Sequence, residues 1–279
     1  MTRPFLKMNG LGNDFVVVDA RDSAFAPPVA DIRAWGDRKA GIGFDQLISI
    51  EDSSDGDAFM RVWNSDGSSV ETCGNALRCV AWVLNPQADD RTLKIDTLGG
   101  PTKARVLRAD ARTGTASVDM GTPGLDWTDI PLSEEMDTLR LELKVGPYDA
   151  PLYHTPCAVS MGNPHCVFFV DDVDQVDVAA TGSLIENHPL FPEGVNVEFA
   201  QVIDRDTVRM RVWERGAGIT KACGTGACAT LVACARRGLT NRSATIAMDG
   251  GPLHVAWVEN DHVIMTGPVE VEFAGDLPA

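Results

Sequence analysis

The feature that most constrains this chain is an internal repeat. The residues MRVW occur at Met60 and again at Met210, 150 positions later. Each copy is followed at the same offset by Cys-Gly, so that Cys73 and Cys223 occupy matched positions. A chain of this kind is predicted to fold as two similar halves, each presenting one cysteine in the same setting.

The repeat extends beyond these blocks. The boundary between the two copies is expected in the Pro- and Gly-rich stretch 121–127, where turn residues cluster, or in the loop beyond it. Further matched positions are Gly12-Asn13 with Gly162-Asn163, Gln46 with Asn196, Asn64 with Glu214 and, one residue out of register, the GGP sequences at Gly99 and Gly250.

Most of the chain has the pattern of short strands separated by turns. Runs such as FVVVD, QLISIE and TLKIDT in the first half, and HCVFFVD, VNVEFAQVID and ATIAMDG in the second, are rich in β-branched and aromatic residues. The segments GNALRCVAWVL and GTGACATLVACA, which follow Cys73 and Cys223, are apolar nearly all round, as in helices buried on every side. Strands wrapped around one central helix, twice over, suit both patterns.

Composition narrows the class of protein. The 279 residues carry a formal net charge of −16, which argues against a general binder of nucleic acid or anionic membranes. The N-terminus lacks the apolar core of a secretory signal, and no run has the roughly 18 apolar residues of a membrane span. Seven cysteines without a C-x-x-C pair indicate reduced thiols in a cytoplasmic protein, with no structural zinc site and no disulfide framework.

The two Cys-Gly turns have a chemistry of their own. A helix N-terminus offers unpaired N–H groups and a partial positive charge, and glycine lets the backbone approach a ligand closely. Each turn is therefore predicted to hold an anion such as a carboxylate. The same field is expected to lower the pKa of the cysteine.

A duplicated fold usually sets its two copies face to face, which would place Cys73 and Cys223 on opposite sides of one ligand. Inverting a carbon stereocentre by proton transfer needs a base on one face of the carbon and an acid on the other. A thiolate and a thiol can fill these roles and exchange them for the reverse direction, since a thiol pKa near ~8.5 allows both states. The other five cysteines are interpreted as packing residues.

Polar residues at matched positions add to this site. Asn13, Gln46, Asn163 and Asn196 lie in or beside strands, where Asn is disfavoured, so each alone indicates a turn or cap, whereas their shared spacing favours a common site. Glu214-Arg215 could bind an amine and a carboxylate, or form a surface ion pair. His165 could tune a nearby thiol or be a structural histidine.

At this point the sequence resembles the diaminopimelate epimerases, cofactor-independent enzymes of lysine and peptidoglycan synthesis. The matching segments span almost the whole chain in order, and the last is the most specific. They are KMNGLGNDFVVVD, GIGFDQL, CGNALRC, SMGNPHCV, FPEGVNVEF and ERGAGITKACGTGACA.

The resemblance implies a fold and a reaction. The fold is of the mixed α/β class, with two pseudo-symmetric halves, each a barrel-like, mostly antiparallel sheet wrapped around a central buried helix, and an active site in the cleft between them. The halves would be residues 1–122 and 123–267, with the last strand, 268–279, returning to the first. The reaction is interconversion of LL- and meso-2,6-diaminoheptanedioate by two thiols without pyridoxal phosphate, and the family forms homodimers.

The resemblance also implies residue roles. Cys73 and Cys223 would be the acid–base pair, and His165 and Glu214 would modulate the thiols. No cofactor or metal is implied, and the partner is a small-molecule substrate. The residues implied to bind it are Asn13, Gln46, Asn64, Gly74, Asn75, Asn163, Asn196, Glu214, Arg215, Gly224 and Thr225.

Two positions depart from the family pattern, and three other functions stay open. Ala76 stands where the family usually has glycine, which is tolerated if its φ is negative, and Asn9 stands where the family often has histidine. The alternatives are a proline or hydroxyproline racemase, a redox protein switched by a Cys73–Cys223 disulfide, and a purely structural module.

Overall fold

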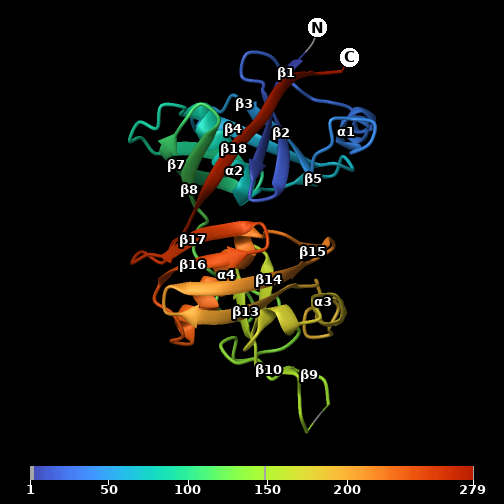
Figure 1. The fold of residues 1–279 in the computed structure, drawn as a ribbon, viewed down its shortest axis with the longest axis vertical. Helices are drawn as coiled ribbons and strands as arrows, with labels where there is room; N and C mark the ends of the chain where they lie inside the picture. Colours follow the sequence, from blue (N-terminus) through green and yellow to red (C-terminus); the bar gives the residue numbers. More distant parts are fainter. Residues whose placement is uncertain (1–2, 148, 279) are drawn as a thin grey trace. The chain divides into compact units, whose positions relative to one another are not determined.

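A computed structural model describes residues 3–147 and 149–278 of the chain. The chain divides into two compact units. Unit 1 takes the residues up to Asp119 together with those from Thr266 onward, and unit 2 is Met120–Met265. Both units combine an extended sheet with a few helices (Figure 1).

Unit 1 contains a closed barrel of eight strands. The strand order is β1-β2-β3-β4-β6-β7-β8-β18, and β1 pairs in turn with β18, which closes the ring. The short strand β5 pairs with β4. The bounds are β1 Arg3–Gly10, β2 Asn13–Asp19, β3 Gln46–Glu51, β4 Ala58–Asn64, β5 Ser69–Val70, β6 Leu93–Thr97, β7 Gly100–Ala109, β8 Thr113–Asp119 and β18 Val263–Leu277.

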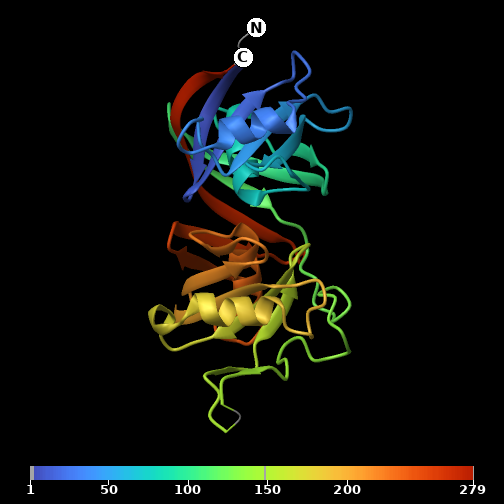
Figure 2. The same ribbon diagram turned by 90° about the vertical axis from the view of Figure 1, so that its right-hand side faces the viewer.

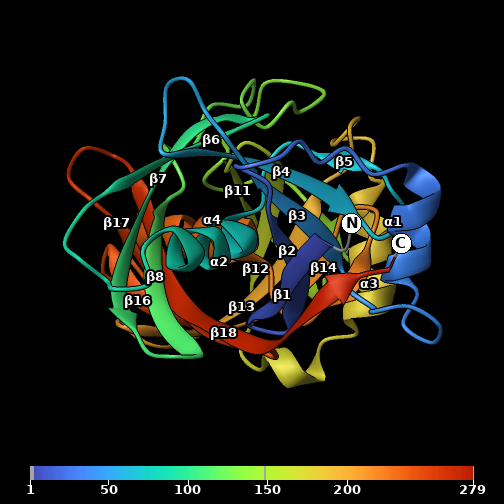
Figure 3. The same ribbon diagram turned by 90° about the horizontal axis from the view of Figure 1, so that it is seen from above.

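The barrel of unit 1 encloses helix α2, Gly74–Leu84. Viewed from above, the strands of unit 1 surround this helix (Figure 3). Every residue of α2 except Val83 is buried, which explains why its sequence is apolar on all faces. The predicted central helix of the first half is therefore confirmed.

Unit 2 is built in the same way around helix α4, Gly224–Arg236. Its sheet runs β18-β17-β16-β14-β13-β12-β11, with β15 paired to β14, while β9 and β10 form a separate hairpin. The bounds are β9 Lys144–Val145, β10 Tyr153–His154, β11 Cys157–Ser160, β12 Pro164–Phe169, β13 Asn196–Asp204, β14 Thr207–Glu214, β15 Gly218–Thr220, β16 Ser243–Met248 and β17 Gly251–Trp257.

The segment 120–124 bridges the two ends of the unit 2 sheet. Val263, at the start of β18, exchanges hydrogen bonds of 2.8 Å with Met120 and Gly121. Gly124 exchanges two of 2.9 Å with Ser160 of β11. The Pro- and Gly-rich stretch at the predicted boundary thus completes the sheet of unit 2.

The strand registers repeat with the sequence. Phe15 of β2 pairs with Gln46 of β3 in parallel, and His165 of β12 pairs with Asn196 of β13 in parallel, 150 residues later. The one-residue difference in register between the two GGP sequences is also present in the strand pairing. Ala58 pairs with Ile95, and the matched Val208 pairs with Ile246, which lies one residue beyond the position that corresponds to Ile95. The predicted pseudo-symmetric pair of mostly antiparallel sheets is confirmed.

Two helices lie outside the sheets and were missed in the sequence. Helix α1, Val29–Gly36, connects β2 to the parallel β3, and α3, Val178–Glu186, connects β12 to the parallel β13. They are visible in blue and yellow on the outer faces of their own units in Figure 2. Parallel neighbours need such crossovers, but these short segments carry no strong helical period. No described helix is long and apolar enough to cross a membrane.

A buried lysine ties the first strands of unit 1 together. The Lys7 side chain on β1 is only 4% exposed, and its Nζ lies 2.5 Å from Asp14 Oδ2 and donates to the carbonyl of Gly43. Arg38 donates to both Asp14 and Asp45. Burial alone would raise the pKa of Asp14, but the hydrogen bonds and charges of Arg38 and Lys7 outweigh it and hold that pKa well below its usual range.

Replacing Asp14 by Asn is expected to lower the free energy of unfolding by about 3 kcal/mol at pH 7, because it leaves the buried Lys7 cation without its partner. Since the pKa of Asp14 is lower in the folded protein, its contribution is complete above about pH 4 and is lost as the pH falls through the folded-state value. Urea unfolding at several pH values checks this.

The matched control is Asp19→Asn at the other end of β2. Asp19 pairs with Arg21, and both side chains are more than a third exposed, at 45% and 39%. An exposed pair contributes about 0–1 kcal/mol. Equal losses in the two variants would contradict the role given to the buried pair.

Candidate active site

The two matched cysteines each stand at the start of an enclosed helix. Cys73 is the N-cap residue of α2 and Cys223 that of α4, both with extended backbone. The carbonyl of Cys73 accepts from the Leu77 N–H, and that of Cys223 from the Ala227 N–H, each at 2.9 Å. The first-turn N–H groups therefore lie beside each sulfur, as the sequence predicts.

In unit 1, one hydrogen-bonded chain leads to Cys73. The Asn13 Oδ1 atom lies 4.0 Å from Cys73 Sγ and 3.5 Å from Asn75 Nδ2. Asn13 Nδ2 donates to Asp45 at 2.8 Å, and the Oδ1 of Asn75 accepts from Arg78 at 3.0 Å. Three of the predicted residues, Asn13, Cys73 and Asn75, are thus brought together.

Gln46 and Asn64 lie at the same end of the unit 1 sheet. β2 and β3 run parallel and begin there, whereas β4 runs antiparallel and ends there. Gln46 Nε2 donates to Asn64 Oδ1 at 3.1 Å, and Asn64 donates to Ser68 at 3.0 Å. Gln46 and Asn64 therefore contact each other as cross-strand partners.

In unit 2, Cys223 is only 5% exposed and is surrounded by polar groups. Its sulfur accepts from the Gly226 N–H at 3.3 Å and lies 3.5 Å from Thr225 Oγ1. Asn163 Nδ2 donates to the same Thr225 oxygen at 3.4 Å. The structure thus brings together Asn163, Thr225 and Cys223, the counterparts of Asn13, Asn75 and Cys73.

The remaining predicted residues of unit 2 lie at the same sheet edge. Asn196 begins β13 and Glu214 ends the antiparallel β14. Asn196 donates to the Pro164 carbonyl at 2.9 Å and accepts from the Arg215 N–H at 3.0 Å. Asn196 therefore holds two backbone segments in place.

Glu214 and Arg215 point to different partners. Glu214 accepts from the hydroxyl of Thr220, and Arg215 donates to the Glu193 carbonyl at 2.9 Å. Among the described residues these two side chains form no ion pair with each other. The alternative of a surface Glu214–Arg215 pair is therefore wrong.

The expected lowering of the Cys223 pKa is also wrong. Burial raises the pKa of this thiol well above its ordinary value, and the negative charges of Glu214 and Glu198 raise it further. The hydrogen bonds from Thr225 and Gly226 act in the opposite direction and are outweighed. A helix N-terminus is worth about 0.3–2 kcal/mol, too little to offset burial beside two carboxylates.

Burial likewise raises the pKa of Glu214, although hydrogen bonds from Thr220 and Cys223 and the charge of His165 lower it in part. Burial also raises the pKa of Cys157, Cys166 and Cys234, and that of Cys79 to about 12. These thiols behave as packing residues, which is how the sequence was interpreted.

Ala76 fits its place in the first turn of α2. It is fully buried, and it is not among the described residues with positive φ. Its counterpart Gly226 has less room, because a Cβ there would lie 2.8 Å from Glu198 Oε1 and 3.2 Å from Cys223 Sγ. The two first turns therefore tolerate different residues.

Three charged residues near the thiols were missed in the sequence: Asp45, Arg78 and Glu198. Arg78 and Glu198 are fully buried within apolar segments, GNALRCVAWVL and VNVEF. A charged residue at a buried position of an otherwise apolar run needs a partner. That signal was present in both segments.

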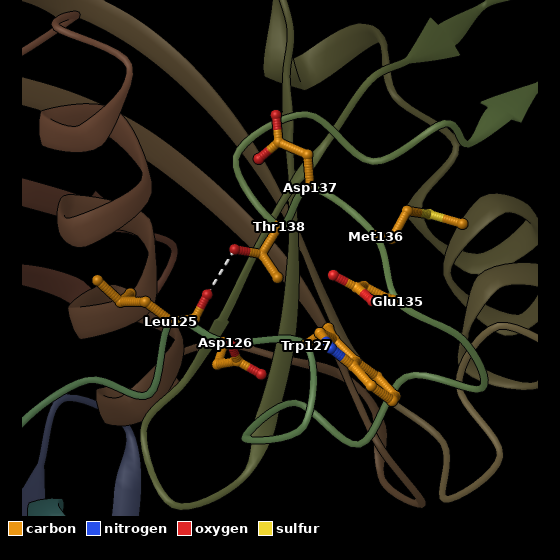
Figure 4. A pocket seen from close by; sticks show the side chains of 7 residues that line it. All are labelled: Leu125, Asp126, Trp127, Glu135, Met136, Asp137 and Thr138. Carbon is orange, nitrogen blue, oxygen red and sulfur yellow. Dashed lines mark hydrogen bonds between the residues drawn. The ribbon is translucent and has the colours of Figure 1, made fainter.

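Two surface hollows lie elsewhere. One, in unit 2, has a volume of about 590 Å³ and is lined by loop residues between Leu125 and Thr138 (Figure 4). Thr138 accepts from Arg236, in the last turn of α4, whereas Cys223 precedes its first turn. The other, in unit 1, is lined by Ala20–Pro27, Glu51, Asp52, Arg61 and Trp63.

The sequence matches a family model over residues 5–125 and 157–272, and that family is the diaminopimelate epimerases. A protein named diaminopimelate epimerase from Caulobacter vibrioides is 55% identical over 287 residues, which cover 100% of this chain and 98% of the relative. One of the same name from Phenylobacterium zucineum is 54% identical over 278 residues, covering 100% and 99%.

Solved structures share the fold at low sequence identity. A hydroxyproline epimerase from Agrobacterium vitis has a TM-score of 0.69 at 15% identity, covering 99% of this chain and 92% of the other. A phenazine biosynthesis protein of the PhzF family from Bacillus anthracis has a TM-score of 0.69 at 13% identity over 100% of both chains. The fold is thus common to several activities, whereas the full-length sequence matches show that the chain belongs to the diaminopimelate epimerase family.

Proposed function

We propose that the chain inverts one α-carbon of 2,6-diaminoheptanedioate by moving protons between that carbon and two thiols, those of Cys73 and Cys223. The stereoinversion follows from membership of the diaminopimelate epimerase family, and the enzyme is an isomerase of lysine biosynthesis. The assignment of the two thiols, and of a mechanism without pyridoxal phosphate, is the proposal.

The observation that supports it most strongly is the equivalence of the two helix starts. Each unit offers one N-cap thiol beside first-turn N–H groups and a side-chain amide, Asn13 in unit 1 and Asn163 in unit 2. A reaction that removes a proton from one face of a carbon and returns one to the other face requires two such groups. Packing alone would not require the match.

The first-turn N–H groups supply a second requirement. Removing a Cα proton develops negative charge on the adjacent carboxylate, and positioned N–H donors stabilise such charge by roughly 3–4 kcal/mol each. We assign this task to the amides of Gly74-Asn75 and Gly224-Thr225. Asn64, Asn196 and Arg215, together with Gln46, would bind the distal amine and carboxylate of the substrate.

Glu214 would connect substrate binding to the thiol. Its carboxylate raises the pKa of Cys223 and accepts a hydrogen bond from that thiol. An ammonium group of the substrate bound at Glu214 would neutralise this charge. The thiolate of Cys223 would then become available when substrate is present.

Reduced protein incubated with LL-diaminopimelate in D2O, without added pyridoxal phosphate, is expected to form the meso isomer with deuterium at the inverted carbon. NMR follows loss of the Cα proton, and chiral analysis follows the product. Cys73→Ala and Cys223→Ala are each expected to lower kcat at least 100-fold, because each removes a positioned acid or base.

Cys79→Ala in α2 and Cys228→Ala in α4 are the matched controls, since both remove a fully buried thiol from the same two helices. They are expected to keep most of the activity. Unchanged turnover in the Cys73 and Cys223 variants would refute the two-thiol mechanism. Inversion of proline in place of diaminopimelate would favour the racemase alternative.

Glu214→Gln is expected to shift the pH midpoint for alkylation of Cys223 downward by about one unit, because it removes a negative charge that raises the pKa of that thiol. Iodoacetamide labelling of substrate-free protein in a Cys73→Ser background measures the midpoint. Glu186→Gln is the control, since Glu186 bonds to Trp213 and Gly216 instead. A midpoint that stays or rises in Glu214→Gln would contradict this role.

The homodimer and the cytoplasmic location remain proposals drawn from the family resemblance. Light scattering during size-exclusion chromatography is expected to give twice the 29.9 kDa of one chain. A mass equal to one chain at micromolar concentration would reject the dimer.

A further inference from the structure

Glu198 of β13 is a buried carboxyl group without an assigned task. It is fully buried, and its Oε1 lies 2.7 Å from Nδ1 of His165, which is also fully buried. Its Oε2 has no hydrogen-bond partner among the described residues. A carboxylate in such a place is costly unless the pair with His165 retains a proton and is neutral overall.

The matched positions in unit 1 are apolar. Phe15 corresponds to His165 and Ile48 to Glu198, at the same registers of the β2–β3 and β12–β13 pairs. Phe15 and Ile48 are fully buried. A sheet of this design therefore packs well with two apolar side chains here, and a buried polar pair gives no advantage in stability over them. Packing therefore does not explain the His165–Glu198 pair.

The pair leads through two side chains to Cys223. His165 Nε2 lies 3.0 Å from Asn163 Oδ1, Asn163 Nδ2 lies 3.4 Å from Thr225 Oγ1, and that oxygen lies 3.5 Å from Cys223 Sγ. An amide oxygen only accepts hydrogen bonds, so Nε2 must carry a proton. Because Thr225 accepts from Asn163, its own O–H remains to donate to the sulfur.

The donor-to-acceptor direction of these hydrogen bonds depends on whether Nε2 of His165 carries a proton. With Nε2 bare, the Asn163 amide would turn its NH2 group to His165 and its oxygen to Thr225. The Thr225 hydroxyl would then donate to Asn163, and the sulfur would lose that donor. A proton shared between Nδ1 and Glu198 leaves Nε2 protonated, whichever of the two atoms holds it.

In unit 1 the matched amide, that of Asn13, has the opposite orientation. Arg78 only donates and Asp45 here only accepts, so the sequence of donors runs from Arg78 to Asn75, then to Asn13 and then to Asp45. Asn13 therefore turns its oxygen towards Cys73, whereas Asn163 turns its nitrogen towards the first turn that carries Cys223. The His165–Glu198 pair belongs to unit 2 alone.

We propose that Glu198 is a positioning residue that keeps a proton on His165 and thereby directs the Thr225 hydroxyl to the sulfur of Cys223. The proposal rests on the proposed function in that Cys223 is taken to act as a thiolate base. Charged and titratable groups reach this cluster from each packed element: His165 from β12, Glu198 from β13 and Glu214 from β14, beside the α4 N-terminus.

The test uses Glu198→Gln, which keeps the size of the side chain but cannot hold the second proton of the pair. The 15N NMR signals of His165 in substrate-free protein at pH 7 are expected to show a protonated Nε2 in the parent and a bare Nε2 in the variant. Alkylation of Cys223, in a Cys73→Ser background, is expected to show about tenfold less thiolate at a given pH, since a donor to the charged sulfur is lost. Removing the negative charge of Glu198 does not offset this loss, because the second proton of the neutral His165–Glu198 pair is lost with it.

A double-mutant cycle separates this relay from a general disturbance of the core. In a Thr225→Val background, Glu198→Gln is expected to leave the alkylation midpoint of Cys223 unchanged, because the hydroxyl that transmits its effect is gone. An equal shift in both backgrounds would overturn the proposal. So would a protonated Nε2 in folded Glu198→Gln, or a bare Nε2 in the parent, which needs no variant to fold.

The NMR and alkylation readouts do not depend on turnover. Expected shifts in both, together with no epimerase activity in the parent, would reject the proposed function while retaining the relay. Full activity with none of these shifts would retain the function and reject the relay. In the active enzyme, Glu198→Gln is expected to lower kcat about tenfold with little change in KM.

Discussion

The structure depends on the enclosure of a helix whose first-turn N–H groups must find partners. A helix surrounded by sheet can be apolar along its length, but its N-terminal donors stay polar. In both units the position that caps them is a cysteine, with a side-chain amide, Asn13 or Asn163, directly beside the turn. The thiol, the first-turn N–H donors and the amide therefore lie at one end of each sheet because a helix fills that sheet.

The two units share the same backbone arrangement and differ in the side chains that it carries. Registers, helix starts and turn positions repeat at a constant offset, whereas buried Phe15 and Ile48 give way to His165 and Glu198. Under the proposed function this difference matters, because one thiol would act on each face of a chiral carbon. Two faces of such a carbon are not equivalent, and the groups that serve them cannot be identical in every respect.

Much of the fold and of the candidate site was predictable from the sequence, because the repeat and the apolar helices are strong signals. The repeat fixed the matched cysteines, and periodicity identified most strands and both enclosed helices. The short crossover helices α1 and α3 were not predicted, because eight or nine residues are too few to show a clear helical periodicity. The sense of the Cys223 pKa shift could not be foreseen either, because it depends on Glu198 and Glu214, whose carboxylates only the fold brings close to the sulfur.

Strand β18 affects the order in which the two units can fold during synthesis. Its fifteen residues start in unit 2 and supply the strand that joins β8 to β1 in unit 1. During synthesis the barrel of unit 1 is therefore one strand short, with unpaired edges on β1 and β8, until β18 has left the ribosome. Unit 2, continuous in sequence, can assemble its helix and sheet first, so the order of folding runs opposite to the order of translation.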